Sequence, residues 1–169
     1  MTNIQIGVIG GGLKNLPPKS KDIILKDAEV VGALIADRKG ILISGGMDGV
    51  MEYSCRGAYL NRGLVIGTPG RQRGLSNQYV SVEICTPIDI GDYLFAGILS
   101  CDSIIVFPGG AGTLAEIALA YRYSKPMIIM RGYDNYLDQL IGKSLDNSKK
   151  IVFLGANTPK EAVDLAFND

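Results

Sequence analysis

Residues 103–116 read SIIVFPGGAGTLAE, an apolar run that passes through a glycine-rich turn into a second apolar stretch. The run Ser103–Phe107 is short and rich in β-branched residues, which predicts a buried strand. Pro108-Gly109-Gly110 predicts a tight turn, and Thr113–Tyr123 has the pattern of a helix. A buried strand that turns directly into a helix is the repeating unit of a parallel α/β sheet.

The same unit recurs along the chain. Further strands are expected at Ile4–Ile9, Ile41–Ile43, Leu64–Ile66, Tyr79–Cys85, Met127–Met130 and Ile151–Leu154. Further helices are expected from Ser20 to about Arg38, after the turn Ser44-Gly45-Gly46 to about Asn61, at Asp89–Ser100, near Tyr136–Leu145 and from Pro159 onward. The first of them should bury Ile23, Ile24, Val30, Val31, Leu34 and Ile35. The alternation predicts a three-layer, doubly wound, Rossmann-like α/β fold with a mainly parallel sheet and a ligand crevice at the carboxyl ends of the strands.

The composition is that of an ordinary globular protein. The 169 residues suit one domain with one core, and hydrophobic residues make up 47% of the chain against 20% charged. The formal net charge is zero, so no overall charge attracts nucleic acid or a membrane surface. No apolar run is long enough to span a bilayer, and the N-terminus does not resemble a signal peptide. We therefore expect a single-domain cytoplasmic protein without nucleic-acid or membrane partners.

The residue types that are missing restrict the chemistry. The chain has no histidine, which excludes Ser–His–Asp triads, imidazole acid–base catalysis and histidine metal sites. Its three cysteines, Cys55, Cys85 and Cys101, are far apart and form no CxxC pair. We expect them to be reduced and buried, and we expect no metal site.

Three of the predicted strands end in glycine-rich turns: Gly10-Gly11-Gly12, Ser44-Gly45-Gly46 and Pro108-Gly109-Gly110. In a parallel sheet these turns lie along one edge, and each leads into a helix whose free N–H groups attract anions. A single turn of this kind can be explained by the sterics of a tight loop. Three along one edge favour a binding site for a small phosphorylated ligand.

Glu116 is a carboxylate in a helix that is otherwise apolar nearly all round. It follows Thr113 by three residues and Gly112 by four, so its side chain should point back toward the glycine turn. There it could accept hydrogen bonds from a ligand or act as a general acid–base group. The spacing Thr113-x-x-Glu116 also fits a capping box, in which the glutamate only satisfies a backbone N–H. Sequence reasoning leaves both interpretations open.

The motif Pro108–Glu116 resembles the LOG-like superfamily of Rossmann nucleotide-binding proteins, in which PGGxGTxxE is a specific signature. Its members include cytokinin-activating phosphoribohydrolases, proteins labelled "lysine decarboxylase-like" and molybdenum cofactor carrier proteins. Ile4–Gly12, Ser44–Glu52 and Val65–Gly70 resemble the other motifs of the superfamily, in the expected order. The undecorated core, the short Asn77-Gln78-Tyr79 segment and the Ile-Ala-Leu-Ala helix are most similar to the molybdenum cofactor carrier branch.

The turns and the motifs together give a candidate binding set. It consists of Gly10, Gly11, Gly12, Ser44, Gly45, Gly46, Gly49, Pro108, Gly109, Gly110, Gly112, Thr113 and Glu116. The resemblance implies that no cofactor is required, and that the ligand is either molybdenum cofactor (molybdopterin) or a nucleoside monophosphate. It also implies a homo-oligomer, a dimer or a dimer of dimers, with Ile117–Tyr123 as the candidate interface.

Two departures from the phosphoribohydrolases affect the functional hypothesis. Those enzymes carry an Arg-Lys pair on the helix before the PGG strand, where this chain has Tyr93-Leu94. This chain also has Asp48 in its second motif, either as a helix N-cap or beside the ligand, where its charge would repel a phosphate. Arg71 and Arg73 could supply positive charge from their loop, or they could be ordinary surface residues.

We therefore expect a binding or carrier protein for a phosphorylated nucleotide-like or pterin ligand. The alternative is a phosphoribohydrolase that cleaves the N-glycosidic bond of nucleoside 5′-monophosphates, with Glu116 as the catalytic carboxylate. A third alternative is a scaffold protein with a vestigial crevice. Decarboxylation of lysine with pyridoxal phosphate is not expected, because no Schiff-base lysine stands among suitable partners.

Overall fold

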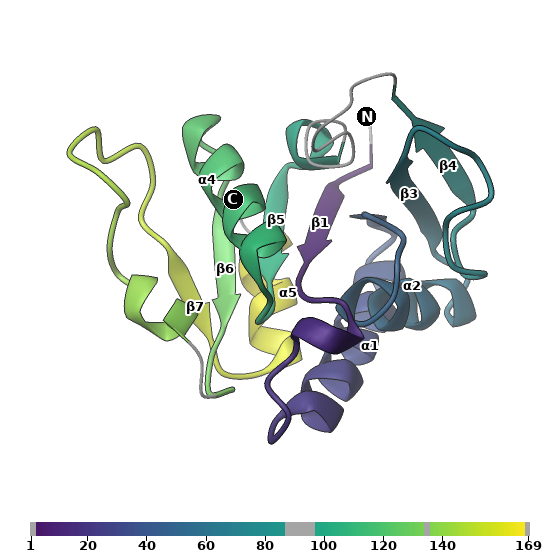
Figure 1. Ribbon diagram of the computed structural model, residues 1–169, viewed down its shortest axis with the longest axis horizontal. Helices are drawn as coiled ribbons and strands as arrows, with labels where there is room; N and C mark the ends of the chain where they lie inside the picture. Colours follow the sequence, from purple (N-terminus) through teal and green to yellow (C-terminus); the bar gives the residue numbers. More distant parts are fainter. Residues whose placement is uncertain (1–2, 87–96, 134–135, 168–169) are drawn as a thin grey trace.

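The computed structural model describes residues 3–86, 97–133 and 136–167. They form a seven-stranded parallel sheet in the order β4-β3-β2-β1-β5-β6-β7 (Figure 1). The strands are β1 (Gln5–Ile9), β2 (Ile41–Ser44), β3 (Leu64–Gly70), β4 (Val82–Cys85), β5 (Ser103–Val106), β6 (Met127–Met130) and β7 (Leu154–Ala156). The helices are η1 (Leu13–Asn15), α1 (Lys21–Asp37), α2 (Val50–Leu60), α4 (Ala111–Arg122), η2 (Tyr136–Leu140) and α5 (Pro159–Phe167). The predicted α/β fold with a parallel sheet is confirmed.

The strand order reverses beside β1. From β1 the chain moves outward through β2, β3 and β4, then returns to place β5 on the other side of β1 and continues to β7. Ile6 pairs in register with Leu42 on one side and with Ser103 on the other. The crevice at such a reversal is where ligands bind in open α/β sheets, so the topology points to the carboxyl ends of β1 and β5.

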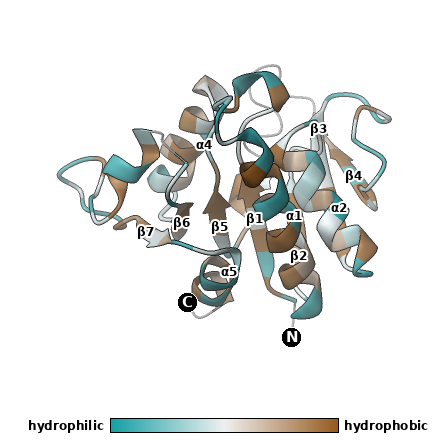
Figure 2. Ribbon diagram, turned by 90° about the horizontal axis from the view of Figure 1, so that it is seen from below, coloured by the Kyte–Doolittle hydropathy of each residue, from teal (hydrophilic) through white to brown (hydrophobic). Residues whose placement is uncertain are grey.

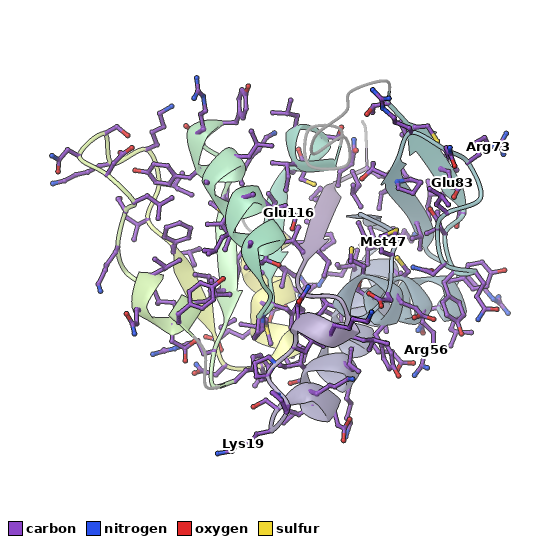
Figure 3. The ribbon with its side chains drawn as sticks, viewed as in Figure 1. Lys19, Met47, Arg56, Arg73, Glu83 and Glu116 are labelled. Carbon is purple, nitrogen blue, oxygen red and sulfur yellow. The ribbon has the colours of Figure 1, made fainter. Side chains whose placement is uncertain are left out.

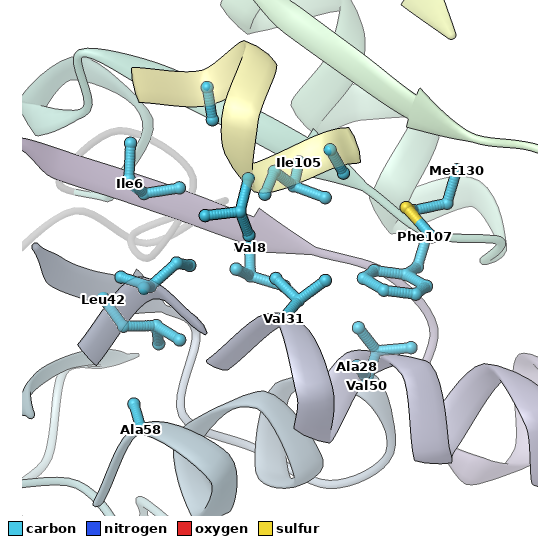
Figure 4. Close-up of a cluster of buried hydrophobic side chains, with 14 of the residues drawn as sticks. Ile6, Val8, Ala28, Val31, Leu42, Val50, Ala58, Ile105, Phe107 and Met130 are labelled. Atoms are coloured by element: carbon cyan, nitrogen blue, oxygen red, sulfur yellow. The ribbon is translucent and has the colours of Figure 1, made fainter. Parts of the chain in front are cut away.

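Helices cover both faces of the sheet (Figure 2). On one face α1, α2 and α5 enclose a core that includes Ile6, Val8, Ile105 and Phe107, several of which are labelled in Figure 4. On the other face α4 and the helical residues 97–100 cover a second cluster. Because side chains alternate along a strand, neighbours such as Ile104 and Ile105 belong to opposite clusters.

The apolar face of α1 differs from the prediction. Ile23 and Val30 are 54% and 38% exposed, whereas Ile24, Val31 and Ile35 are fully buried. Two glycines explain the difference, because α1 and α2 cross at close range. A Cβ on Gly32 of α1 would overlap with the carbonyl oxygen of Ser54, and one on Gly57 of α2 would overlap with that of Glu29. The face that packs against α2 is therefore partly made of small residues, which a search for large apolar side chains does not detect.

Several element boundaries also differ. β3 continues to Gly70 instead of ending at Ile66, and its pairing with β4 shifts register between Gly67 and Gly70, which accommodates Pro69. β4 begins at Val82 instead of Tyr79, because residues 77–80 form a turn closed by the Val80 N–H and the Asn77 carbonyl.

Near the C-terminal end, Tyr136–Leu140 is a short 3-10 helix instead of a helix to Leu145, and β7 begins at Leu154 instead of Ile151. The helix expected at Asp89–Ser100 falls largely outside the described residues, as does the Tyr93-Leu94 position; only residues 97–100 are seen to be helical.

The three cysteines are free, as predicted. Cys55 and Cys101 are buried, and burial raises the pKa of their thiols to about 11 and about 12. Cys85 was expected to be buried but is only half-buried, because it lies on the edge strand β4. None of the helices in the described ranges has both the length and the apolar character that a membrane span requires.

Candidate functional site

The three glycine-rich turns meet at the carboxyl ends of β1, β2 and β5. The Gly11 N–H donates to the Pro108 carbonyl oxygen at 2.8 Å and ties the first turn to the third. The Val50 N–H donates to the Gly11 carbonyl oxygen at 3.1 Å and ties the start of α2 to the first turn. Main-chain hydrogen bonds therefore join the first turn to the third turn and to the start of α2, the helix that follows the second turn.

A pocket of about 230 Å³, here called the glycine pocket, opens above this surface. It is lined by Gly10, Gly11, Gly12, Asn15, Met47, Met51, Pro69, Gly110, Gly112, Thr113 and Glu116. Seven members of the candidate binding set are thus brought together. Ser44 and Gly45 line a much smaller cavity behind Glu116, and Gly46, Gly49, Pro108 and Gly109 shape the turns without lining the pocket.

Sequence reasoning missed four lining residues. Met51 lies in the first turn of α2, and Met47 lies in the loop before it, so no helical spacing relates the two and no sequence pattern identifies them. Asn15 lies in η1, a short element that no pattern predicted. Pro69 reaches the pocket because β3 is longer than expected.

The N-terminus of α4 faces the glycine pocket through Gly110, Gly112 and Thr113. Gly110 is the N-cap residue, and no side chain makes a capping hydrogen bond there. Thr113 lies inside the helix and is 3% exposed, with its hydroxyl packed against Gly109. The capping-box interpretation of Thr113 and Glu116 is therefore wrong, because Thr113 is not the cap. The first N–H groups of α4 remain available to a ligand.

Glu116 is the ionisable group of the glycine pocket. Its side chain points inward from α4 (Figure 3), and the residue is only 9% exposed. Within residues 3–86, 97–133 and 136–167, nothing donates a hydrogen bond to its carboxyl group or forms an ion pair with it. Burial raises its pKa to about 8. At neutral pH the group is therefore mostly an uncharged carboxylic acid, which can donate one hydrogen bond and accept others.

The second turn is held in shape by glycine backbone and by Asn77. Gly49 has a φ of +69°, and a Cβ there would overlap with the Gly11 carbonyl oxygen, so only glycine fits. The Asn77 amide donates to the carbonyl oxygens of Gly46 at 2.9 Å and Met47 at 3.0 Å. These contacts fix the path of the turn beside the pocket.

Asp48 does not cap α2, so the predicted role as a helix N-cap is wrong. Gly49 is the N-cap residue, and no side chain makes a capping hydrogen bond. The Asp48 carboxylate lies beside Gly12, where an added Cβ would overlap with it. Asp48 therefore stands at the rim of the glycine pocket, not inside it.

The aromatic and basic residues near the glycine pocket differ in whether they contact its turns. The Tyr136 hydroxyl donates to the Gly109 carbonyl oxygen at 3.4 Å, so this residue overhangs the third turn. Tyr133 instead packs on Phe107 inside the core. Arg71 and Arg73 are exposed in the loop after β3, and neither lines the glycine pocket.

The segment Ile117–Tyr123, the candidate interface, has one buried face and one exposed face. Ile117 and Tyr121 pack against the sheet, and Tyr121 stacks on Phe153. Ala118, Arg122 and Tyr123 are exposed. An interface at this segment would use the exposed face, and it stays a prediction.

Comparison with known proteins agrees with this arrangement. The molybdenum cofactor binding protein of Rippkaea orientalis has a similar structure, with a TM-score of 0.82, 32% identity, and 98% of this chain and 96% of that chain covered. The molybdenum cofactor carrier protein of Chlamydomonas reinhardtii matches with a TM-score of 0.81, 25% identity, and 97% and 96% coverage. An uncharacterized protein of Archaeoglobus fulgidus is 36% identical over 139 residues, which are 78% of this chain and 87% of that protein.

The resemblance inferred from the glycine motifs, to LOG-like proteins and within them to the molybdenum cofactor carrier branch, is confirmed. The model of the SLOG cluster4 family matches residues 3–163, nearly the whole chain. The chain belongs to the SLOG cluster4 family.

Proposed function

We propose that this protein binds and carries a small phosphorylated heterocycle, a pterin such as molybdenum cofactor, in the glycine pocket. One observation carries the proposal: the uncapped N-terminus of α4 and the buried, unpartnered Glu116 face the same pocket. The carboxyl group of Glu116 has no hydrogen-bond partner among the described residues, so a ligand in the pocket can supply one.

The lining of the pocket suits an anion that is bound by main-chain groups. It contains glycines, Asn15 and Thr113 but no lysine or arginine among the described residues. The N–H groups of the first turn of α4 carry the positive end of the helix dipole, which attracts a phosphate. An uncharged Glu116 adds a donor at the same place, whereas an ionised Glu116 would repel the phosphate.

The lining of the pocket favours carriage over glycosidic hydrolysis. Burial raises the pKa of Glu116 and so disfavours the ionised form that would stabilise a developing ribosyl cation, although a protonated carboxyl could serve as a general acid. No arginine lines the pocket within the described residues to assist the reaction. The matched proteins whose names mention molybdenum cofactor are described as binding or carrier proteins, which supports the same choice.

The test is calorimetric titration of the purified protein with molybdopterin, with ribose 5-phosphate and with nucleoside 5′-monophosphates. We expect saturable binding that weakens in Gly112→Asp, which places a negative charge at the helix N-terminus. The matched control is Ala118→Asp, because Ala118 is exposed on the same helix and does not line the pocket. Release of free base from a nucleoside monophosphate, lost in Glu116→Gln, would overturn the carrier proposal in favour of the phosphoribohydrolase.

A further inference from the structure

A second hollow adjoins the glycine pocket, and Met47 lines both of them. This outer hollow has a volume of about 450 Å³. It is lined by Met47, Asp48, Glu52, Leu75, Ser76, Asn77 and Gln78. Figure 3 labels Met47 on the opposite side of β1 from Glu116, so a ligand that starts beside Glu116 reaches the outer hollow by passing over Met47.

The two hollows have opposite chemical character. The glycine pocket offers N–H groups and an uncharged Glu116, which suit an anion. The outer hollow offers the carboxylates of Asp48 and Glu52, which repel an anion and accept hydrogen bonds from N–H groups. Within the described part of the chain, neither carboxylate is engaged in a hydrogen bond or an ion pair. A ligand with a phosphate at one end and an N–H-rich edge at the other complements both hollows.

The side chain between the hollows is suited to a flat ring. Met47 is 46% exposed, whereas Met127 and Met130 are fully buried in the sheet. A thioether is polarizable and makes favourable contacts with aromatic rings. The Met47 main chain is fixed by the hydrogen bond from Asn77 at 3.0 Å, so the position of this side chain is set by the fold.

We propose that Met47 is the shelf on which the heterocycle of the ligand packs, with the phosphate in the glycine pocket and an amino-bearing N–H edge directed at Asp48 and Glu52. This inference rests on the proposed function, and it adds the class of ring. A 2-amino group next to a ring N–H, the edge that guanine and pterins share, presents two parallel donors to a carboxylate. A ring that carries only acceptors on that edge is disfavoured.

The experiment compares three probes on the full-length protein at pH 7: ribose 5-phosphate, inosine 5′-monophosphate (IMP) and guanosine 5′-monophosphate (GMP). We expect IMP to bind about fivefold more tightly than ribose 5-phosphate, because its ring contacts Met47. GMP should bind about fivefold more tightly again, because it adds the amino group.

Single substitutions separate the contribution of the ring to the affinity from that of its N–H edge. Met47→Ala should remove the advantage of IMP over ribose 5-phosphate, measured as the ratio of the two affinities in the same variant, while Met47→Leu keeps most of that advantage. Asp48→Asn and Glu52→Gln should reduce the preference for GMP over IMP. Leu60→Ala is the control, because Leu60 is another exposed large apolar side chain and lines neither hollow.

The outcomes are distinguishable. If no probe binds, the proposed function is wrong, and so is the proposal that Met47 packs against the ligand ring. If ribose 5-phosphate binds and IMP gains nothing, or if Met47→Ala weakens both equally, the shelf is overturned while the phosphate site stands. If GMP and IMP bind alike, the assignment of the N–H edge to Asp48 and Glu52 is overturned.

Discussion

Gly32 of α1 lies directly against the Ser54 carbonyl oxygen of α2, with no room for a Cβ between the two helices. Gly57 of α2 makes the equivalent contact with Glu29 of α1. Two glycines that face the partner backbone in this way set the distance at which the helices cross. α2 begins beside the glycine pocket, so this crossing also positions Met51 in the pocket wall.

Gly32→Ala should destabilise the protein although alanine has the higher helix propensity. Propensity contributes up to about 1 kcal/mol in favour of alanine. The overlap with Ser54 forces the helices apart, at a cost of about 1–3 kcal/mol or more. Urea unfolding followed by circular dichroism measures the difference. Gly112→Ala is the control, because an added Cβ meets open space there, and a loss of stability in that variant equal to that of Gly32→Ala would contradict the explanation.

The stability of the protein should fall as pH rises from about 4.5 to about 8. The pKa of Glu116 is raised from 4.5 to about 8 by burial, so the folded protein retains a proton that the unfolded chain has already lost. In that window the free energy of unfolding decreases by up to about 1.4 kcal/mol per pH unit. The contribution of Glu116 to the free energy of unfolding is fully present below pH 4.5. It is lost as the pH rises through the folded pKa of about 8.

Glu116→Gln tests that assignment, because glutamine has a similar shape and no titration. Urea unfolding of the wild type and the variant at pH 5, 7 and 9 should give similar stabilities at pH 5 and a more stable variant at pH 9. Parallel pH profiles for the two proteins would show that Glu116 does not titrate in this range.

Binding of ribose 5-phosphate should weaken above pH 8. Ionisation of Glu116 replaces a hydrogen-bond donor with a negative charge next to the phosphate. Calorimetry between pH 6.5 and 9 should show an affinity that declines through the pKa of about 8 in the wild type and stays nearly constant in Glu116→Gln. A decline of the same size in the variant would have to come from another group.

Asn77→Ala should both destabilise the protein and loosen the second turn. The side chain makes three hydrogen bonds, to the carbonyl oxygens of Gly46 and Met47 and from the N–H of Tyr79. At about 0.5–1.5 kcal/mol each, their loss costs about 2–4 kcal/mol. Asn61→Ala, which removes one bond to Gly57, is the matched control and should cost about 1 kcal/mol. Equal losses in the two variants would show that Asn77 does not hold the turn.

Thiol labelling should proceed at Cys85 before the other two cysteines. Cys85 is half-buried on an edge strand, whereas burial raises the pKa of Cys55 to about 11 and of Cys101 to about 12. A thiol reagent at pH 8 should modify one site rapidly in the native protein, and mass spectrometry should locate it at Cys85. Cys85→Ser should abolish this fast phase, and a fast phase that survives would place the reactive thiol elsewhere.

The parts of the fold that depend on local patterns could be predicted from sequence. Met127–Met130 is an apolar run between turn signals, and it is a strand with the predicted bounds. Pro159 marks the start of α5, because proline suits the first helical turn. The glycine turns converge because parallel strands end at one edge of a sheet, which follows from topology alone.

Features of the fold that depend on contacts between residues far apart in the sequence could not be predicted. Ile23 and Ile24 are adjacent and equally apolar, and only the tertiary packing of α1 decides that Ile24 is buried in the core while Ile23 is exposed. Whether Thr113 or Gly110 caps α4 depends on how the third turn packs against the first, which periodicity does not show. Asn15 was missed for the same reason, because η1 has no sequence pattern of its own.

The hydrogen bonds from Gly11 to Pro108 and from Val50 to Gly11 have an evolutionary consequence. They make the floor of the pocket a piece of main chain that forms during folding and that side-chain replacement hardly alters. We therefore expect changes in ligand preference among related proteins to fall on the few side chains around this floor, such as Asn15, Met47 and Glu116. On that expectation, a lineage exchanges one ligand for another by replacing those side chains while the main-chain floor stays the same.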